Sequence, residues 1–216
     1  MKEKWDERFA RAEYVYGTDP NVFFREILSS LQPGRILLPA EGEGRNAVYA
    51  AESGWEVHTF DFSEQARTKA LALAAERRVE ITYDIADLET YRFPISAYDA
   101  VGLFFVHMPP ALRRRVHTAC ARSLRPGGTL VLEAFSKRQR GYESGGPRDE
   151  NLLYTVDTLV EDFSSLQCSL CEERVVVFDE GEFHRGEGCV VRFVGTLLSA
   201  GSDESLTGVN PPPFSP

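Results

Sequence analysis

A glycine-rich turn followed by an acidic residue is the stretch of the sequence best suited to binding chemistry. Gly42, Gly44 and Ala47 form a GxGxxA pattern, and Asp61 follows Gly42 by 19 residues. Glycines adopt backbone angles that other residues avoid and let the backbone approach a ligand closely. A carboxylate at this distance from the turn accepts hydrogen bonds from ribose hydroxyls in nucleoside-binding units. The spacing therefore predicts a site for a nucleoside-containing ligand.

The charges beside this turn discriminate between such ligands. Glu41 and Glu43 flank the glycines, and only Arg45 offsets them. These carboxylates would repel a pyrophosphate, which disfavours a nicotinamide dinucleotide. S-adenosylmethionine carries an α-amino group and a sulfonium, and Glu41 is suited to face these cationic groups. We therefore expect S-adenosylmethionine as the cofactor, with Asp61 at its ribose.

Strand and helix patterns surround the turn. The apolar residues 36–38 open a buried strand, a helical pattern follows the glycines and ends at Gly54, and residues 57–60 form a second strand. Ser63 is expected to cap the helix after that strand. The remaining patterns predict two short helices within 5–31, the second capped by Asp19 or Asn21, helices over 64–78 and 152–166, and strands over 79–85, 100–106, 129–135, 174–178 and 189–198.

Four stretches carry a resemblance to a known family. They read PAEGEGRNAVYAAESGWEVHTFDFS, YDIADL, YDAVGLFFVHMPP and LRPGGTLVLEAFS. The chain resembles the class I S-adenosylmethionine-dependent methyltransferases over residues 5–198, and in particular the small-molecule branch that includes the tellurite-resistance and thiopurine methyltransferases. The resemblance implies an α/β fold with a Rossmann-like, seven-stranded, mostly parallel sheet, helices on both faces and a C-terminal antiparallel hairpin.

The same resemblance implies how the chain is divided and which residues hold the cofactor. Residues 1–198 would form a single methyltransferase domain that begins with a helical lid segment at 1–34, and the Gly-, Ser- and Pro-rich residues 199–216 are expected to be a disordered tail. Asp87 would meet the adenine amino group and Leu88 would flank the ring, although Asp is also common in surface turns. The expected cofactor-binding residues are Ala40, Glu41, Gly42, Gly44, Asn46, Phe60, Asp61, Phe62, Asp87, Leu88 and Phe104.

The acceptor side rests on fewer signals. His107 follows the apolar strand over 100–106 and is a candidate general base or substrate contact, with a structural, hydrogen-bonded histidine as the alternative. Tyr16 belongs to an aromatic lid or packs on the sheet, and for Trp5 we favour packing. The expected catalytic residues are His107 and Tyr16, and the expected substrate-binding residues are Tyr16, Phe105, Lys137, Arg138 and His184.

Two further segments bear on the acceptor. Lys137, Arg138 and Arg140 form a basic patch in a glycine-containing loop, which could attract an anionic acceptor or be a solvated charge run. His184 and Arg185 lie between the last two strands, in a turn expected to face the reaction site. The arginines at 113–115 read as a solvated helix face. At 108–111 the sequence reads Met-Pro-Pro-Ala, where nucleic-acid amino-methyltransferases carry a polar residue, two prolines and an aromatic residue that grip a base, so base methylation loses support.

One cysteine and histidine spacing is compatible with zinc. Cys168, Cys171, His184 and Cys189 are separated by 2, 12 and 4 residues. The intervening residues already form a good strand pattern, in which alternate thiols commonly pack against neighbours. We therefore expect no metal.

Composition limits the possible partners. The chain has 216 residues and a formal charge of −9, which disfavours nucleic acid and anionic membranes as partners and favours a small-molecule substrate. The charged N-terminus lacks a signal sequence and no apolar run is long enough to cross a membrane, so we expect a cytoplasmic monomer or homodimer.

These features predict an enzyme. A sulfonium is already an activated leaving group, so methyl transfer to a small soft nucleophile, such as a thiol or a chalcogen oxyanion, proceeds by direct displacement and requires no nucleophilic side chain. Two alternatives remain: a non-catalytic S-adenosylmethionine-binding regulator and an NAD(P)-dependent oxidoreductase. The identity of the acceptor stays open.

Overall fold

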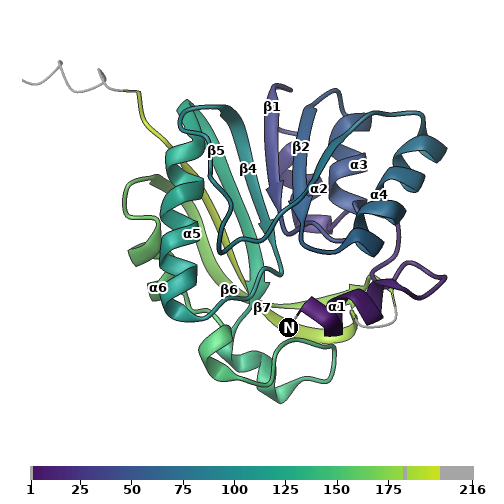
Figure 1. Ribbon diagram of the computed structural model, residues 1–216. Helices are drawn as coiled ribbons and strands as arrows, with labels where there is room; N and C mark the ends of the chain where they lie inside the picture. The colour runs from purple at the N-terminus through teal and green to yellow at the C-terminus, as the bar shows by residue number, and fades with distance from the viewer. Residues whose placement is uncertain (1, 182–183, 200–216) are drawn as a thin grey trace, which may run out of the picture.

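Seven strands form one sheet in the computed structural model, which describes residues 2–181 and 184–199 (Figure 1). The strand order is β3-β2-β1-β4-β5-β7-β6, with parallel pairing from β3 to β5 and antiparallel pairing of β7 with both β5 and β6. The Rossmann-like sheet and its C-terminal hairpin are confirmed. The strands are β1 Arg35–Pro39, β2 Glu56–Asp61, β3 Thr82–Ile85, β4 Tyr98–Phe104, β5 Leu124–Phe135, β6 Gln167–Asp179 and β7 Arg185–Thr196.

Helices cover both faces of the sheet (Figure 1). They are α1 Lys2–Phe9, α2 Val22–Leu28, α3 Arg45–Glu52, α4 Glu64–Arg77, α5 Pro110–Ser123 and α6 Val156–Asp162, with short 3-10 helices η1 Lys137–Gly141 and η2 Glu150–Leu152. Successive residues of a strand point to opposite faces. Leu37 of β1 accordingly belongs to the core beneath α5 and α6, whereas its neighbours Ile36 and Leu38 pack against Phe24 of α2 and Ala47 of α3.

Local signals place the helix ends as expected. The Ser63 side chain accepts a hydrogen bond from the Ala66 N–H at 3.3 Å at the start of α4, and the Asn21 side chain accepts one from the Phe24 N–H at 2.9 Å at the start of α2. Such caps satisfy amides that lack a partner in the first helical turn. Gly54 follows α3 with a φ of 87°, a backbone angle that favours glycine.

The C-terminal hairpin is longer than predicted. Pairing extends β6 back to residue 167 and begins β7 at residue 185, because successive residues of the two strands pair from end to end except at one register shift between Cys168 and Leu170. Cys168 is paired with Gly195, whereas Cys189 is paired with Val175. These positions lie roughly 20 Å apart along the strand at ~3.3 Å per residue. Within the two described ranges, no three His, Cys, Asp or Glu side chains are arranged to hold a metal ion.

The prediction of a solvated arginine face on α5 was wrong for Arg113. This side chain is buried and its Nε lies 2.7 Å from Asp162 Oδ2, an atom that His117 Nδ1 also contacts at 2.8 Å. Arg114 and Arg115 are exposed as expected.

Two expectations concern the membrane and the tail. No helix of the described residues has the length and apolar character needed to cross a membrane. Apart from Ser199, the predicted tail at 199–216 lies outside the described residues.

Candidate functional site

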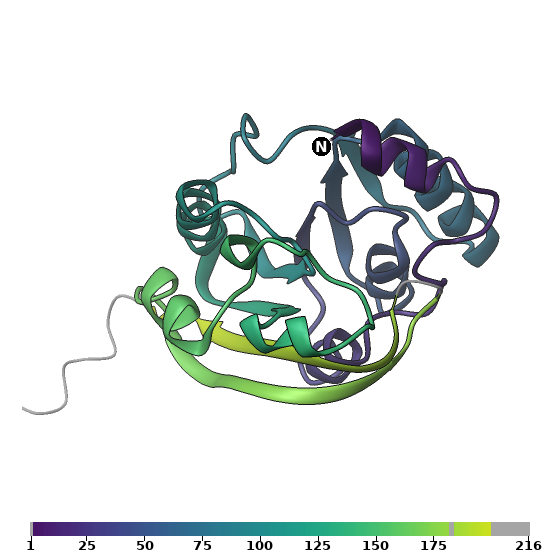
Figure 2. The ribbon, with the colours of Figure 1, turned by 90° about the horizontal axis from the view of Figure 1, so that it is seen from below.

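A cavity of about 1750 Å³ opens at the carboxyl ends of the parallel strands. This is the edge of an open α/β sheet at which ligands bind. Figure 2, a view from below, shows α1 and the loop after β5 on this side of the sheet. Typical small-molecule pockets measure roughly 300–1,000 Å³, so the cavity has room for a cofactor and a second small molecule.

Most residues predicted from the sequence line this cavity, although they come from six separate segments of the chain. Those that do are Tyr16, Ala40, Glu41, Gly42, Asn46, Phe60, Asp61, Phe62, Asp87, Leu88, Phe104, Phe105, His107 and His184. Gly44, Lys137 and Arg138 do not line it.

Gly44 serves the packing of two helices. A Cβ at this position would lie 2.5 Å from Ala70 Cβ, and the backbone has a φ of 88°. The short distance shows that α3 and α4 approach too closely for a side chain at this position. The positive φ also favours glycine. Gly44 therefore lies against α4 rather than at the cavity, and its contact with the cofactor stays a prediction.

Lys137 and Arg138 lie at a shallow surface depression beside the cavity. The 3-10 helix η1 turns the Arg138 side chain outward, where it pairs with Glu173 of β6 at 3.2 Å and stays 67% exposed. Arg140 and Arg148 of the same loop do line the cavity. The basic rim of the cavity is therefore made by Arg140 of the predicted patch together with Arg148.

Glu41 and Asn46 hold the turn and α3 together. The Glu41 carboxylate accepts hydrogen bonds from the N–H groups of Asn46 at 2.7 Å and Ala47 at 3.0 Å, and from Asn46 Nδ2 at 3.2 Å. A carboxylate at a helix N-terminus satisfies orphan amides and interacts favourably with the helix dipole. Burial nevertheless raises the pKa of Glu41 to about 7.

Asp61 lies at the end of β2, opposite the glycine turn. Its Oδ2 accepts a hydrogen bond from the Gly42 N–H at 3.2 Å and its Oδ1 accepts one from the Ser63 N–H at 3.0 Å. Burial raises the pKa of Asp61 to about 6, although these amides lower it in part. Its carboxylate and that of Glu41 are therefore costly to ionise in the cofactor-free site.

A cationic nucleoside ligand fits this arrangement. An ammonium or sulfonium group would favour the ionised forms of Glu41 and Asp61, and ribose hydroxyls would supply hydrogen-bond donors. Gly42 has a φ of 64°, and a Cβ added at this glycine would lie 3.1 Å from the ring of Phe9 in α1. S-adenosylmethionine has both the charge and the hydroxyls that suit the residues of this turn.

The loop after β3 forms the next wall of the cavity. Asp87 is exposed and its Oδ1 accepts a hydrogen bond from the Glu89 N–H at 2.7 Å, so it makes a local turn and also borders the cavity. Leu88 lies half-buried beside it. Phe60 is fully buried and stacks on Tyr91 with ring centroids 3.9 Å apart.

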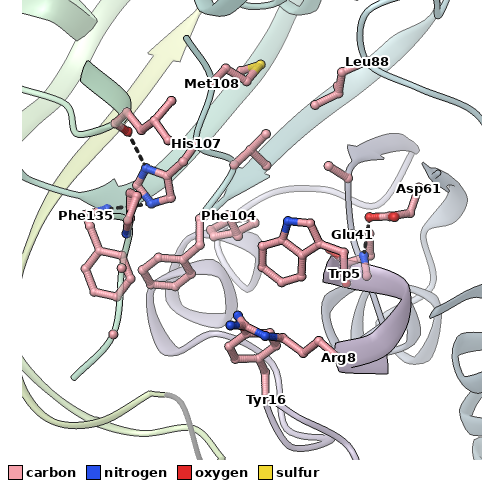
Figure 3. Close-up of a pocket in the computed structure, with 18 of the residues that line it drawn as sticks. Trp5, Arg8, Tyr16, Glu41, Asp61, Leu88, Phe104, His107, Met108 and Phe135 are labelled. Atoms are coloured by element: carbon pink, nitrogen blue, oxygen red, sulfur yellow. Dashed lines mark hydrogen bonds between the residues drawn. The ribbon is translucent and has the colours of Figure 1, made fainter. Parts of the chain in front are cut away.

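The N-terminal segment covers the cavity. Figure 3 shows Trp5 and Arg8 projecting from α1 into it, near Tyr16. Trp5 stacks on Phe9 at 5.4 Å, and Arg8 Nη1 donates a hydrogen bond to the Tyr16 hydroxyl at 2.8 Å. Trp5 thus borders the site, where the sequence favoured simple packing.

His107 is held by the backbone. Its Nδ1 lies 2.7 Å from the Leu152 carbonyl oxygen, which makes Nδ1 the protonated nitrogen, and its Nε2 lies 3.5 Å from the Phe135 N–H (Figure 3). Burial lowers the pKa of His107 to about 4. The contact of Nδ1 with the Leu152 carbonyl oxygen fixes the ring, so the geometry favours the structural alternative for His107.

His184 lies within a group of aromatic rings. The centroid of its imidazole is 4.7 Å from the Tyr16 ring, 4.4 Å from Phe105 and 5.3 Å from Phe135. Phe105 has a φ of 55°, an unfavourable angle for a bulky residue. Strained backbone of this kind concentrates at functional sites.

The sequence reasoning missed four residues that complete the site. Arg8, Arg45, Phe135 and Glu180 border it or join its walls. Arg45 was seen only as a countercharge, and its Nη2 in fact lies 2.8 Å from Glu180 Oε2. In the sequence, Glu180 lies four residues before His184. This spacing was the one available sign that the Glu180 side chain lies on the same side of the turn as His184. Arg185, by contrast, is exposed beside Asp179.

Comparisons with known proteins agree with this fold. The profile of the family described as "Methyltransferase domain" matches residues 36–128. The ubiquinone biosynthesis O-methyltransferase of Alkalilimnicola ehrlichii is 32% identical over 127 residues, which are 56% of this chain and 49% of that protein. The chain thus spans about half the length of the curated relative that it matches.

Solved structures share the fold at low identity. A protein studied for the conversion of a disulfide bond into a thioacetal group during echinomycin biosynthesis superposes with a TM-score of 0.71 at 19% identity, over 93% of each chain. TehB from Haemophilus influenzae gives a TM-score of 0.66 at 12% identity, over 90% of this chain and 66% of the other. Residues 36–128 are thus similar to a methyltransferase domain, and this match together with the fold supports S-adenosylmethionine as the cofactor.

Proposed function

We propose that the protein transfers a methyl group from S-adenosylmethionine to a small molecule with a soft nucleophile, such as a thiol or a chalcogen oxyanion, as in the branch that includes the tellurite-resistance and thiopurine methyltransferases. One observation carries the proposal. The cavity joins a glycine turn, with the half-buried carboxylate of Glu41 and the buried carboxylate of Asp61, to an aromatic wall within a single volume of about 1750 Å³. The first part suits a cofactor and the second suits an acceptor.

The residues of the turn would hold the cofactor. Gly42 lets the backbone come close to it, Asp61 would accept hydrogen bonds from its ribose, and Glu41 would balance its positive charge. Phe62 and Leu88, which are partly exposed in the cavity, would offer apolar surface for the base. When bound, S-adenosylmethionine supplies a methyl group already activated by a sulfonium.

The aromatic wall would orient the acceptor and exclude water. Phe104, Phe105 and Phe135 line the cavity together with Tyr16. Apolar side chains around a reaction site strengthen electrostatic interactions within it, and fixed orientation supplies much of the rate acceleration in a displacement. Arg140 and Arg148 border the same region and favour an acceptor with negative charge.

The alternatives fit this site less well. A regulator that only binds S-adenosylmethionine would leave the aromatic part of the cavity without a use. An oxidoreductase would need to place a pyrophosphate beside Glu41, whose carboxylate already occupies the N-terminus of α3.

A screen for S-adenosylhomocysteine release tests the proposal. The purified chain would be incubated with S-adenosylmethionine and small thiols, selenite, tellurite or halides, with heat-denatured protein as the control. We expect release that depends on one acceptor class. Binding of S-adenosylmethionine by calorimetry without release for any acceptor would contradict methyl transfer and favour the regulator.

A further inference from the structure

We propose that His184 accepts the proton of the methyl acceptor and that Glu180 positions its imidazole for this role. The inference rests on the proposed function and adds a residue role to it. Both residues come from the turn between β6 and β7, outside the strand and turn that hold the cofactor candidates.

His184 is placed to meet an acceptor. It lines the cavity, is 5% exposed, and is enclosed by the rings of Tyr16, Phe105, Phe135 and Phe178 at centroid distances of 4.4 to 5.3 Å. A buried polar group without a hydrogen bond is costly, and its Nδ1 makes no hydrogen bond with the described residues. His184 thus lies at the wall of the cavity, and no described residue holds its Nδ1 by a hydrogen bond in a structural role.

Glu180 supplies the charge that an imidazolium needs. Its Oε2 lies 3.6 Å from His184 Nδ1 and 2.8 Å from Arg45 Nη2. Burial alone would raise the pKa of Glu180, but its interactions with His184 and Arg45 lower it to about 2, so the carboxylate is ionised. Catalytic hydrogen bonds are commonly long in ligand-free sites and shorten when the ligand binds.

This geometry assigns the two ring nitrogens. Nδ1 faces Glu180 and would carry the proton, which leaves Nε2 with the lone pair for the acceptor. Burial, Arg45 and Arg8 lower the pKa of His184, while Glu180 raises it, so the ring is neutral and able to accept a proton at neutral pH. His107 differs in this respect, because its Nδ1 contacts a carbonyl oxygen rather than a carboxylate.

The tight packing of this turn against the N-terminal segment fixes the pair. A Cβ at Gly181 would lie 2.5 Å from the Val15 carbonyl oxygen and 2.8 Å from Tyr16 Cα, so the backbones are in direct contact. Arg45 Nη1 also donates to the Tyr16 carbonyl oxygen at 3.2 Å. The turn, the lid segment and the first turn of α3 therefore form one unit around His184.

The reaction moves one proton to His184 and two electron pairs, one to the new bond and one to sulfur. His184 Nε2 takes the proton of the acceptor S–H or O–H, and the acceptor electron pair forms the bond to the methyl carbon. The electron pair of the breaking carbon–sulfur bond stays on sulfur, which becomes a neutral thioether. The imidazolium, paired with Glu180, then releases its proton to solvent. Acceptors that are already ionised do not need this step.

A kinetic comparison tests the role of the ring. We expect His184→Gln to lower kcat/KM by about 10²- to 10⁴-fold for a benzyl thiol, which is protonated at neutral assay pH. For an electron-poor aryl thiol of the same size, which is already ionised, the loss should stay within several-fold. His58→Gln is the matched control, because His58 also contacts a carboxylate, Asp84 at 2.8 Å, but lies outside the cavity. Equal losses with both acceptors, or no loss, would overturn the proposal.

A binding measurement without turnover gives an independent readout. 4-Nitrophenol absorbs differently when it is ionised. Its absorbance therefore reports the pKa of the nitrophenol hydroxyl when this molecule is bound to the protein. We expect the cofactor-free protein to bind it with a pKa about one unit or more below its solution value, and His184→Gln to abolish the shift. Failure to bind, or an unshifted pKa, would contradict the role of His184.

The variant Glu180→Gln keeps the ring and tests positioning. Without the carboxylate, the pKa of His184 should fall, so the acidic limb of kcat/KM should move to lower pH while the rate at neutral pH decreases. If Glu180 had only a structural role, the Glu180→Gln variant would have a lower kcat/KM at every pH, and the acidic limb of its pH profile would stay at the same pH. If no acceptor supports release by the wild-type chain, the proposed function fails, and the nitrophenol measurement still decides the role of His184.

Discussion

The guanidinium of Arg45 lies 2.8 Å from the carboxylate of Glu180, although 135 residues separate them in sequence. Arg45 begins α3 directly after the glycine turn, and Glu180 follows β6 at the hairpin turn. Both side chains are about nine-tenths buried. This ion pair joins the cofactor side of the cavity to the side that holds His184.

Removing one partner of this pair should destabilise the fold. Arg45→Met leaves the Glu180 carboxylate buried near His184 without its cation, which typically costs about 3–5 kcal/mol. Chemical denaturation followed by circular dichroism measures the free energy of unfolding. The double variant Arg45→Met/Glu180→Gln should recover part of the loss, and additive losses would mean that the two groups do not interact energetically.

Asp61 is expected to contribute directly to cofactor affinity. Asp61→Ala should weaken S-adenosylmethionine binding by roughly 1.5–3 kcal/mol, the range for hydrogen bonds to a charged group. Calorimetric titration gives the dissociation constant. Asp84→Ala is a suitable control, because Asp84 lies on the next strand with a half-exposed side chain. Equal affinity for Asp61→Ala and the wild type would remove the ribose role.

Two glycines of one turn should respond to substitution in different ways. A side chain at Gly42 meets a positive φ and enters the cavity, so Gly42→Val should abolish cofactor binding. Gly44→Ala forces α3 away from Ala70 and should reduce stability by roughly 1–3 kcal/mol. Thermal unfolding and calorimetry separate the two effects. Normal binding by a folded Gly42→Val variant would place the ligand elsewhere.

Cofactor affinity should rise with pH. The pKa values of Glu41 and Asp61, about 7 and about 6, lie above the ordinary carboxyl range of about 4. In the cofactor-free protein these groups retain protons that the unfolded chain has lost, so the free energy of unfolding should decrease as pH rises from about 4 to 7.

A cationic cofactor favours the ionised carboxylates, so binding should tighten over that range and release protons near neutral pH. Calorimetry in buffers of different ionisation enthalpy counts those protons. Glu41→Gln should release fewer of them, and a flat affinity between about pH 5.5 and 8 would show that these carboxylates do not face the cofactor.

The basic rim should attract anionic acceptors through Arg140 and Arg148. Arg140→Gln/Arg148→Gln is expected to lower kcat/KM for an anionic acceptor and to flatten its salt dependence, because such steering is screened over about 10 Å at 0.1 M salt. The matched control is Lys137→Gln/Arg138→Gln, which removes the same charge outside the cavity. The same loss in both pairs would argue against a local role for the rim.

The sequence by itself determined the features that depend on neighbouring residues. The alternation of Ile36, Leu37 and Leu38, the caps at Asn21 and Ser63 and the glycine turn each follow from short-range geometry, which the local residue types set. The resemblance of the same stretches to a family was enough to predict the mostly parallel sheet with its reversed hairpin.

Only the tertiary structure decided which polar side chains meet. Arg113 looked solvated until Asp162, 49 residues away, came within 2.7 Å of it, and the close packing of Gly44 against Ala70 follows only from the way α3 and α4 meet. The outward turn of Arg138 and the pairing of Arg45 with Glu180 also depend on how separate elements pack. Such contacts leave no periodic signal, because their energy comes from burial and charge that exist only once the chain has folded.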